Sequence, residues 1–196
     1  NRYNDDAPAV WTMLRAFPPP QAMERTVLTE AMVRAYNMLE PVTFLQSYVK
    51  VAAIDPAFTS GGDDCMYQLA KVGMSSAGVM TICYDRQVAI PILASSPIPV
   101  TEQIAVAAVK LLDEDGVDQY YLAVDDSGTQ SVADAIATKR GNNLLRLNYS
   151  ESPPDLPVSV NNDVSAKKKY KNVITWLYYT VKEYAERNQV KGLPVD

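Results

Sequence analysis

Between Thr101 and Ser150 the chain alternates helix-like and strand-like segments, which limits the possible folds more than any other feature. Residues 101–116, TEQIAVAAVKLLDEDG, carry apolar residues at helical spacing and end on a glycine. The strand-like QYYLAV follows, then a second helix-like segment, TQSVADAIATKRG, and the strand-like NLLRLNYS. Strands that are joined by helices in this way pair in parallel within one sheet, with right-handed crossovers.

Three β-rich segments precede this alternation, at residues 48–55, 64–72 and 78–93. Turn residues separate them at Gly61-Gly62 and at 75–78, which predicts an antiparallel meander, and we expect a further turn near Asp85-Arg86. Three meander strands followed by helix, strand, helix and strand is the order of the ribonuclease-H-like fold. The predicted class is therefore α/β, with a mixed sheet of meander and parallel strands flanked by helices.

The two ends of the chain differ in character from this central part. Residues 1–46 contain a PPP run and one predicted helix at about 30–39, capped by Thr29 and ended by Pro41. We interpret them as a linker and a short helix, and residues 47–196 as the main domain. Within that domain we expect a Pro-rich loop at 151–160, an amphipathic helix at 170–186, and a strand or tail from Asn188.

The composition of the chain is that of a globular domain. At 196 residues with 47 % hydrophobic and 21 % charged residues, the chain has the size and balance of one α/β domain, or one domain plus an appendage. No apolar run approaches the ~20 residues that a membrane helix needs, and no signal pattern is present at the N-terminus, which predicts a cytosolic protein. The cysteines, Cys65 and Cys83, are predicted to be reduced core residues.

Histidine is absent from the chain. This excludes Ser-His-Asp and Cys-His nucleophilic schemes as well as His-ligated zinc sites. Catalysis, if the chain has any, must use carboxylates, lysine or a bound metal ion.

Two of the predicted strands end on acids. The first core strand ends on Asp55, before Pro56, and QYYLAV ends on Asp125 and Asp126. In the predicted sheet these strands are neighbours, so Asp55 and Asp125 are expected to face each other at one edge. Carboxylates are hard ligands, and two Mg²⁺ or Mn²⁺ ions about 3.5–4 Å apart can hydrolyse a phosphodiester. Asp126 is a further candidate ligand, whereas Asp63 and Asp64 are interpreted as turn residues.

A simpler interpretation of these acids remains open, because aspartate is common where a strand ends and a turn begins. The basic run Lys167-Lys168-Lys169, with Lys171, likewise has two interpretations: it could bind a nucleic-acid backbone, assisted by Lys139 and Arg140, or it could be a solvated helix start. A net charge of −5 argues against nonspecific binding of nucleic acid by the whole surface.

Several stretches, in the right order, resemble the nuclease domain of the large terminase subunit of tailed bacteriophages. They are NDDAPAVWTMLRAFP, VAAIDPAFTSGGDD, YYLAVDDSGTQSVADAI, LLRLNYSESPPD and KYKNVITWLYYTVKEYAE. The resemblance implies that residues 1–46 close a preceding motor domain. It also implies that residues 47–196 are a ribonuclease-H-like nuclease domain without its C-terminal end.

By this resemblance Asp55 and Asp125 are catalytic, metal-binding acids of a two-metal endonuclease that cuts double-stranded viral DNA during genome packaging. The implied partners are the small terminase subunit and the portal, in the cytoplasm of the infected bacterial host. The family's third acid lies on a later helix, beyond the segment that resembles GLPVD. The chain has no GxxxxGK[ST] phosphate loop, so the ATPase motor is not part of it.

Two alternatives remain at this stage. In the first, the domain is a noncatalytic module that binds DNA or a motor partner, and its acidic site is vestigial or incomplete. In the second, it is another ribonuclease-H-like enzyme, such as a junction resolvase or a recombinase.

Overall fold

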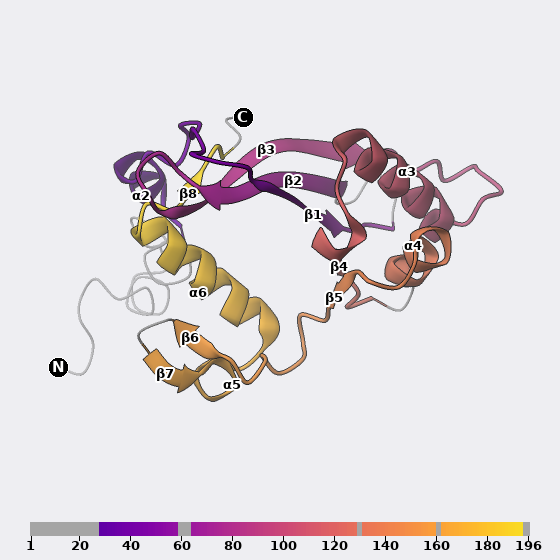
Figure 1. Ribbon diagram of the computed structural model, residues 1–196. Helices are drawn as coiled ribbons and strands as arrows, with labels where there is room; N and C mark the ends of the chain where they lie inside the picture. Colours follow the sequence, from indigo (N-terminus) through magenta and orange to yellow (C-terminus); the bar gives the residue numbers. More distant parts are fainter. Residues whose placement is uncertain (1–27, 59–63, 129–130, 160–161, 194–196) are drawn as a thin grey trace, which may run out of the picture.

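A six-stranded mixed sheet forms the centre of the molecule. The structure is a computed structural model that describes residues 28–58, 64–128, 131–159 and 162–193. The sheet has the order β5-β4-β1-β2-β3-β8. Its strands are β1 (Val49–Asp55), β2 (Cys65–Met74), β3 (Met80–Ile90), β4 (Leu122–Asp125), β5 (Leu145–Leu147) and β8 (Val190–Lys191). β1, β2 and β3 form an antiparallel meander, whereas β4, β5 and β8 join by parallel pairing (Figure 1). The predicted ribonuclease-H-like layout is confirmed.

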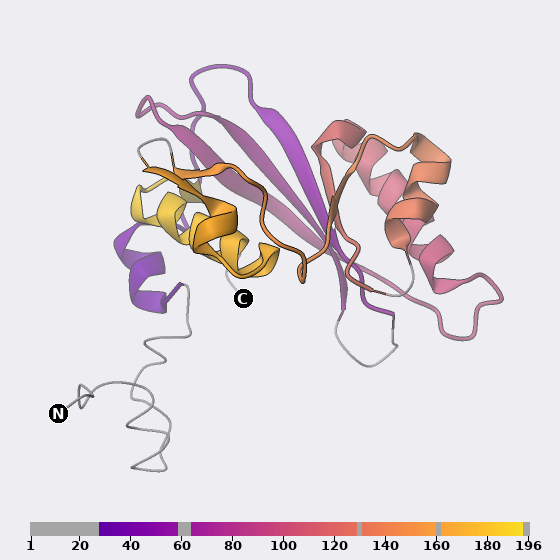
Figure 2. The same cartoon turned by 90° about the horizontal axis from the view of Figure 1, so that it is seen from below.

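Helices α3 (Val100–Asp115) and α4 (Val132–Arg140) cover one face of the sheet. Figure 2 shows the sheet between these two helices and α6 (Val173–Glu186). Alternation along the strands turns every second side chain toward α3 and α4. The main core lies there and includes Ala52, Ile54, Leu122, Val124, Ile104, Ala108, Leu112, Val132 and Ile136. Gly116, at φ +65°, ends α3 as the sequence predicted, because glycine adopts the left-handed conformation without steric cost.

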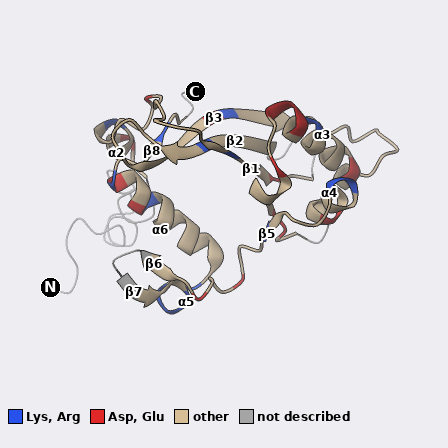
Figure 3. Ribbon diagram, in the orientation of Figure 1, with Lys and Arg blue, Asp and Glu red and all other residues tan. Residues whose placement is uncertain are grey.

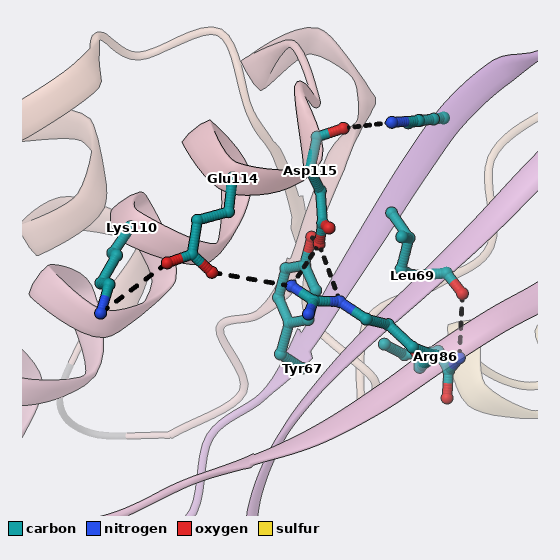
Figure 4. Close-up of polar contacts among 8 residues, drawn as sticks. Tyr67, Leu69, Arg86, Lys110, Glu114 and Asp115 are labelled. Carbon is teal, nitrogen blue, oxygen red and sulfur yellow. Dashed lines mark hydrogen bonds and ion pairs between the residues drawn. The ribbon is translucent and has the colours of Figure 1, made fainter.

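A cluster of polar side chains fastens the end of α3 to the meander (Figure 4). The buried Tyr67 hydroxyl donates to Asp115 Oδ2 at 2.8 Å, and Arg86 donates to the same oxygen from Nε at 3.2 Å and Nη2 at 2.9 Å. Lys50 Nζ donates to the backbone oxygen of Asp115 at 2.6 Å. Burial, and then the hydrogen bond to Asp115, raise the pKa of Tyr67 well above its usual value.

The predicted turn near Asp85-Arg86 is wrong, because β3 continues through both residues. The pairing with β2 steps from Leu69↔Arg86 to Ala70↔Tyr84, so Asp85 is an extra residue in the ladder. A β-bulge of this kind accommodates a residue of turn type without ending the strand. Asp85 also pairs with Lys71 Nζ at 2.9 Å.

Several boundaries differ from the predicted ones. Helix α2 (Glu30–Ala35) is shorter than predicted, although Thr29 caps it by accepting from Met32 N at 3.2 Å. Residues 119–121 form a 3-10 turn, so β4 begins only at Leu122. The predicted Pro-rich loop contains strand β6 (Pro157–Ser159), which pairs with β7 (Asn162–Ser165) and precedes α5 (Ala166–Lys169). The predicted turn at residues 61–62 and the segment 1–27 lie outside the described residues.

Helix α2 and the residues that follow it pack on β8. Met38 is buried against Ala185 and Val190. Lys191, only 9 % exposed, donates to the backbone oxygens of Tyr36 and Asn37 at 2.9 and 3.1 Å and to Asn188 Oδ1 at 2.7 Å. Residues 28–38 therefore contact the main domain directly, and the predicted boundary at residue 46 stays a prediction.

Cys65 and Cys83 are free and buried, as predicted. Within the described ranges, no helix has the length and apolar character that crossing a bilayer would require.

Candidate functional site

Asp55 and Asp125 lie side by side where β1 and β4 end. The two strands are parallel, and their pairing runs from Ala52↔Leu122 to Ile54↔Val124, so the next residue of each strand is the acid. The sequence analysis placed the two acids together because it predicted that these strands are neighbours, and this pairing is confirmed. Because parallel strands carry their carboxyl ends to the same edge, both carboxylates belong to one surface of the molecule.

Alternation also determines which face of the sheet carries the acids. Ile54 and Val124 are buried against α3 and α4. Asp55 and Asp125 are therefore directed to the opposite face, like Ala53 and Ala123. A shallow apolar groove on that face is lined by residues of β1, β2, β3, β4 and β5, among them Ala53, Gln68, Tyr84, Ala123 and Leu145. Asp55 and Asp125 come two residues after the lining residues Ala53 and Ala123 on β1 and β4.

Asp125 is held by its own turn. Its Oδ1 accepts a hydrogen bond from Ser127 N at 2.9 Å, so the turn-capping interpretation describes part of its role. The Asp125 side chain is half-buried, whereas Asp55 is exposed. A capping bond to one oxygen fixes the direction of the Asp125 carboxylate at the edge of the sheet.

Tyr149 is a residue of this site that the sequence did not single out. It follows β5, whose Leu147 pairs with Asp125, and its backbone N donates to Ser127 Oγ at 2.8 Å. Burial raises the pKa of the Tyr149 phenol, and the negative charges of Asp125 and then Asp55 raise it further. The phenol thus lies within the field of both acids. Its position in the sequence could have identified it, because it lies two residues after Leu147, the residue that pairs with Asp125.

Asp126 has a different environment from Asp125. Its Oδ1 accepts from Ser131 Oγ at 2.8 Å, and its Oδ2 is 3.4 Å from Arg146 Nη1. The same Arg146 nitrogen lies 2.7 Å from Asp134 Oδ1 in the first turn of α4. Both carboxylate oxygens of Asp126 therefore have partners. Through Ser131 and Arg146 they connect the turn after β4 to α4 and β5. The structure brings together Asp55 and Asp125, and it places Asp126 in this ion-pair cluster.

The buried thiol of Cys65 lies near Asp55. Burial raises the pKa of Cys65, the backbone hydrogen bond with Ala57 lowers it, and the charge of Asp55 raises it again. The net direction is upward, so Cys65 stays protonated at neutral pH and behaves as a core residue.

The donor set suits a hard divalent cation. Two neighbouring carboxylates offer oxygen ligands, and Mg²⁺ commonly uses one or two carboxylates with water and substrate oxygens. Among the described residues, no group of three or more His, Cys, Asp or Glu side chains is arranged to hold a metal ion. Asp63 lies outside the described residues, and Asp64 is an exposed residue just before β2.

The predicted basic segment is exposed. Lys167, Lys168 and Lys169 form α5, beside the β6-β7 hairpin, and Lys171 follows them (Figure 3). Lys169 Nζ lies 5.1 Å from the centre of the Tyr170 ring and 3.7 Å from Glu183 Oε1. These contacts raise the pKa of Lys169 and keep it charged.

Lys139 and Arg140 join the two helices of the core face. Lys139 pairs with Glu102, and Arg140 Nη2 lies 3.0 Å from Asp113 Oδ1. Arg140 also donates to the backbone oxygen of Val117 at 3.2 Å. Both side chains therefore hold α4 against α3.

No protein-family model matches the chain, and a search of curated proteins finds no significant match either.

Proposed function

We propose that this chain is a metal-dependent endonuclease domain that cleaves double-stranded DNA. The observation that carries the proposal is the placement of Asp55 and Asp125 side by side at the carboxyl ends of β1 and β4, on the face away from α3 and α4. The ribonuclease-H-like strand order supports it, because that order brings exactly these two strand ends together. The sequence resemblance to terminase nuclease domains adds the class of substrate, viral DNA during packaging.

Asp55 and Asp125 would hold Mg²⁺ or Mn²⁺, with two ions in the full site, and Asp126 is retained as a further candidate ligand. When bound, such ions activate a water and stabilise the leaving oxygen of a phosphodiester. The bond from Ser127 N holds Asp125 Oδ1 and so restricts the orientation in which the carboxylate would bind an ion. Asp126 orients the turn by its contacts with Ser131 and Arg146.

The experiment is cleavage of supercoiled plasmid by the full chain with Mg²⁺, Mn²⁺ or a chelator. Asp55→Asn and Asp125→Asn should each lose most of the metal-dependent cleavage, because the amide removes the charge that binds the ion. Asp118→Asn is a matched control: Asp118 Oδ1 also accepts a backbone N–H two residues on, at 2.9 Å, but it belongs to the 3-10 turn before β4. The Asp118 variant should cut like the parent.

Other outcomes separate the alternatives. Cutting that does not require a metal ion would reject this site. Cleavage at the parent rate in both the Asp55→Asn and the Asp125→Asn variant would also reject it. DNA binding without any cleavage would favour the noncatalytic module. A preference for branched junctions over linear duplex would favour a junction resolvase.

Lys167, Lys168, Lys169 and Lys171 are proposed to contact the phosphate backbone. Replacing Lys167 and Lys168 by glutamine should weaken duplex binding and reduce the salt dependence of the dissociation constant, since each phosphate contact releases counterions. Lys110→Gln is the control, because Lys110 is an exposed lysine on α3 whose partner is Glu114. An unchanged salt slope in the double variant would reject the role of this segment.

A further inference from the structure

The segment after β5 connects the acid pair to α6. Tyr149 N donates to Ser127 Oγ at 2.8 Å, and Ser127 N donates to Asp125 Oδ1 at 2.9 Å. On the other side, the Tyr149 backbone oxygen accepts from Ile174 N at 3.4 Å in the first turn of α6. The backbone of Tyr149 is therefore bonded both to the turn that orients Asp125 and to a long helix. This leaves little freedom in where its side chain begins.

The end of β5 and the bond to Ser127 place Tyr149 near the two acids. Leu147 pairs with Asp125 across β4 and β5, and Tyr149 follows two residues later, beyond the ends of both strands. The ring is half-buried, and it interacts electrostatically with both Asp125 and Asp55. Tyr149 is thus a hydrogen-bond donor that belongs to the same edge as the acids but carries no charge of its own at neutral pH.

We propose that Tyr149 contacts the substrate at the acid pair, donating its phenolic O–H to a non-bridging oxygen of a nucleic-acid phosphodiester. The inference depends on the proposed endonuclease function and extends it. Two carboxylates repel an anionic phosphate, and a neutral donor beside them offers attraction without adding negative charge. Ser127 is then a positioning residue, because its hydroxyl holds Tyr149 while its N–H holds Asp125.

The test uses the full chain and the substitution Tyr149→Phe, which keeps the ring and removes only the hydroxyl. The control is Tyr178→Phe, the same change at an exposed tyrosine of α6 that also interacts with Tyr149. In single-turnover cleavage of a duplex, Tyr149→Phe should lower the rate on the order of 100-fold, the lower end of the cost of removing one hydrogen-bond donor to a developing charge. Tyr178→Phe should cut at the parent rate.

A second readout does not require cleavage. Tb³⁺ serves as a luminescent probe for a hard-cation site, and nearby tyrosine sensitises its emission. The tyrosine-excited Tb³⁺ emission should fall at least twofold in Tyr149→Phe, with an unchanged Tb³⁺ titration midpoint, and should be unaffected in Tyr178→Phe. Ser127→Ala should lower the cleavage rate less than Tyr149→Phe does, and an unchanged thermal midpoint in Tyr149→Phe would exclude a purely structural role.

The outcomes distinguish this inference from the proposed function. Parent-like cleavage and Tb³⁺ emission in Tyr149→Phe, with Asp125→Asn inactive, would overturn the role of Tyr149 alone. Absence of metal-dependent cleavage and of Tb³⁺ binding in the parent itself would overturn the endonuclease proposal and the role of Tyr149 with it.

Discussion

Replacing Asp115 by alanine should destabilise the fold by about 1–4 kcal/mol. The Tyr67 hydroxyl is fully buried and donates to Asp115 Oδ2, so the substitution leaves a buried donor without its acceptor, a loss of about 1–3 kcal/mol. Arg86 loses the same oxygen, but its side chain is 39 % exposed and regains water, so its share is about 0–1 kcal/mol. The bond from Lys50 to the backbone of residue 115 does not depend on the side chain.

Urea unfolding of the full chain, followed by circular dichroism, measures this loss. The same loss should appear in thermal unfolding, where each kcal/mol lowers the midpoint of a chain of this length by about 2–4 °C, so a fall of roughly 2–16 °C is expected. Asp113→Ala is the control, because Asp113 lies in the same last turn of α3 but is 62 % exposed beside Arg140, and it should cost less than about 1 kcal/mol.

A double-mutant cycle with Tyr67→Phe isolates the central hydrogen bond. Tyr67→Phe alone should cost about 1 kcal/mol, and the double variant should be less destabilised than the two single losses together. An Asp115→Ala variant as stable as Asp113→Ala would refute the reasoning, because it would show that the buried phenol does not depend on Asp115.

Three further effects are expected from the same structure. Gly192→Ala should destabilise by more than about 2 kcal/mol in urea unfolding, because φ is +67° and the added Cβ would clash with the backbone oxygen of Tyr84. Lys191→Met should cost about 1–3 kcal/mol and speed amide exchange at the end of α2, since the backbone oxygens there lose a buried donor. Burial raises the pKa of Tyr67 above that of an unfolded tyrosine. Above pH 10 the unfolded chain therefore binds fewer protons than the folded one, and stability should fall by up to about 1.4 kcal/mol per pH unit. Tyr67→Phe should reduce this slope in unfolding measured from pH 9 to 11, and a slope that does not change would contradict the shift.

The sequence predicted the sheet because apolar runs of strand length alternate with segments of helical spacing, and connection rules then leave few strand orders. The pairing of Asp55 with Asp125 followed from that order alone. The preference for Asp125 over Asp126 as a ligand was also made from the sequence, but its physical reason is visible only in the structure, where alternation along a strand of known burial assigns Asp125 to the open face. The environment of Asp126 depends on Arg146, which is distant in sequence.

The β6-β7 hairpin and Tyr149 could not be predicted from their own sequence segments. Proline and polar residues around β6 and β7 have the composition of a loop, and the hairpin exists where Val158 packs against Ala166 and Tyr170. That packing is tertiary and leaves no periodic pattern in so short a stretch. Tyr149 was missed for a similar reason, since its importance comes from the end of a neighbouring strand and not from its own segment.

The bulge at Asp85 has a consequence for association between molecules. Within the described residues, the outer edge of β3 pairs with β8 only at Ile82 and Cys83, and Gly192 lies against the backbone of Tyr84, so the stretch from Asp85 to Ile90 has no strand partner on that side. An exposed edge of this length is a template for a strand from another chain. Here the extra residue twists the edge, and the exposed side chains of Asp85 and Arg86 put opposite charges on it. A feature that suggests a turn in the sequence thus discourages edge-to-edge aggregation in the folded protein.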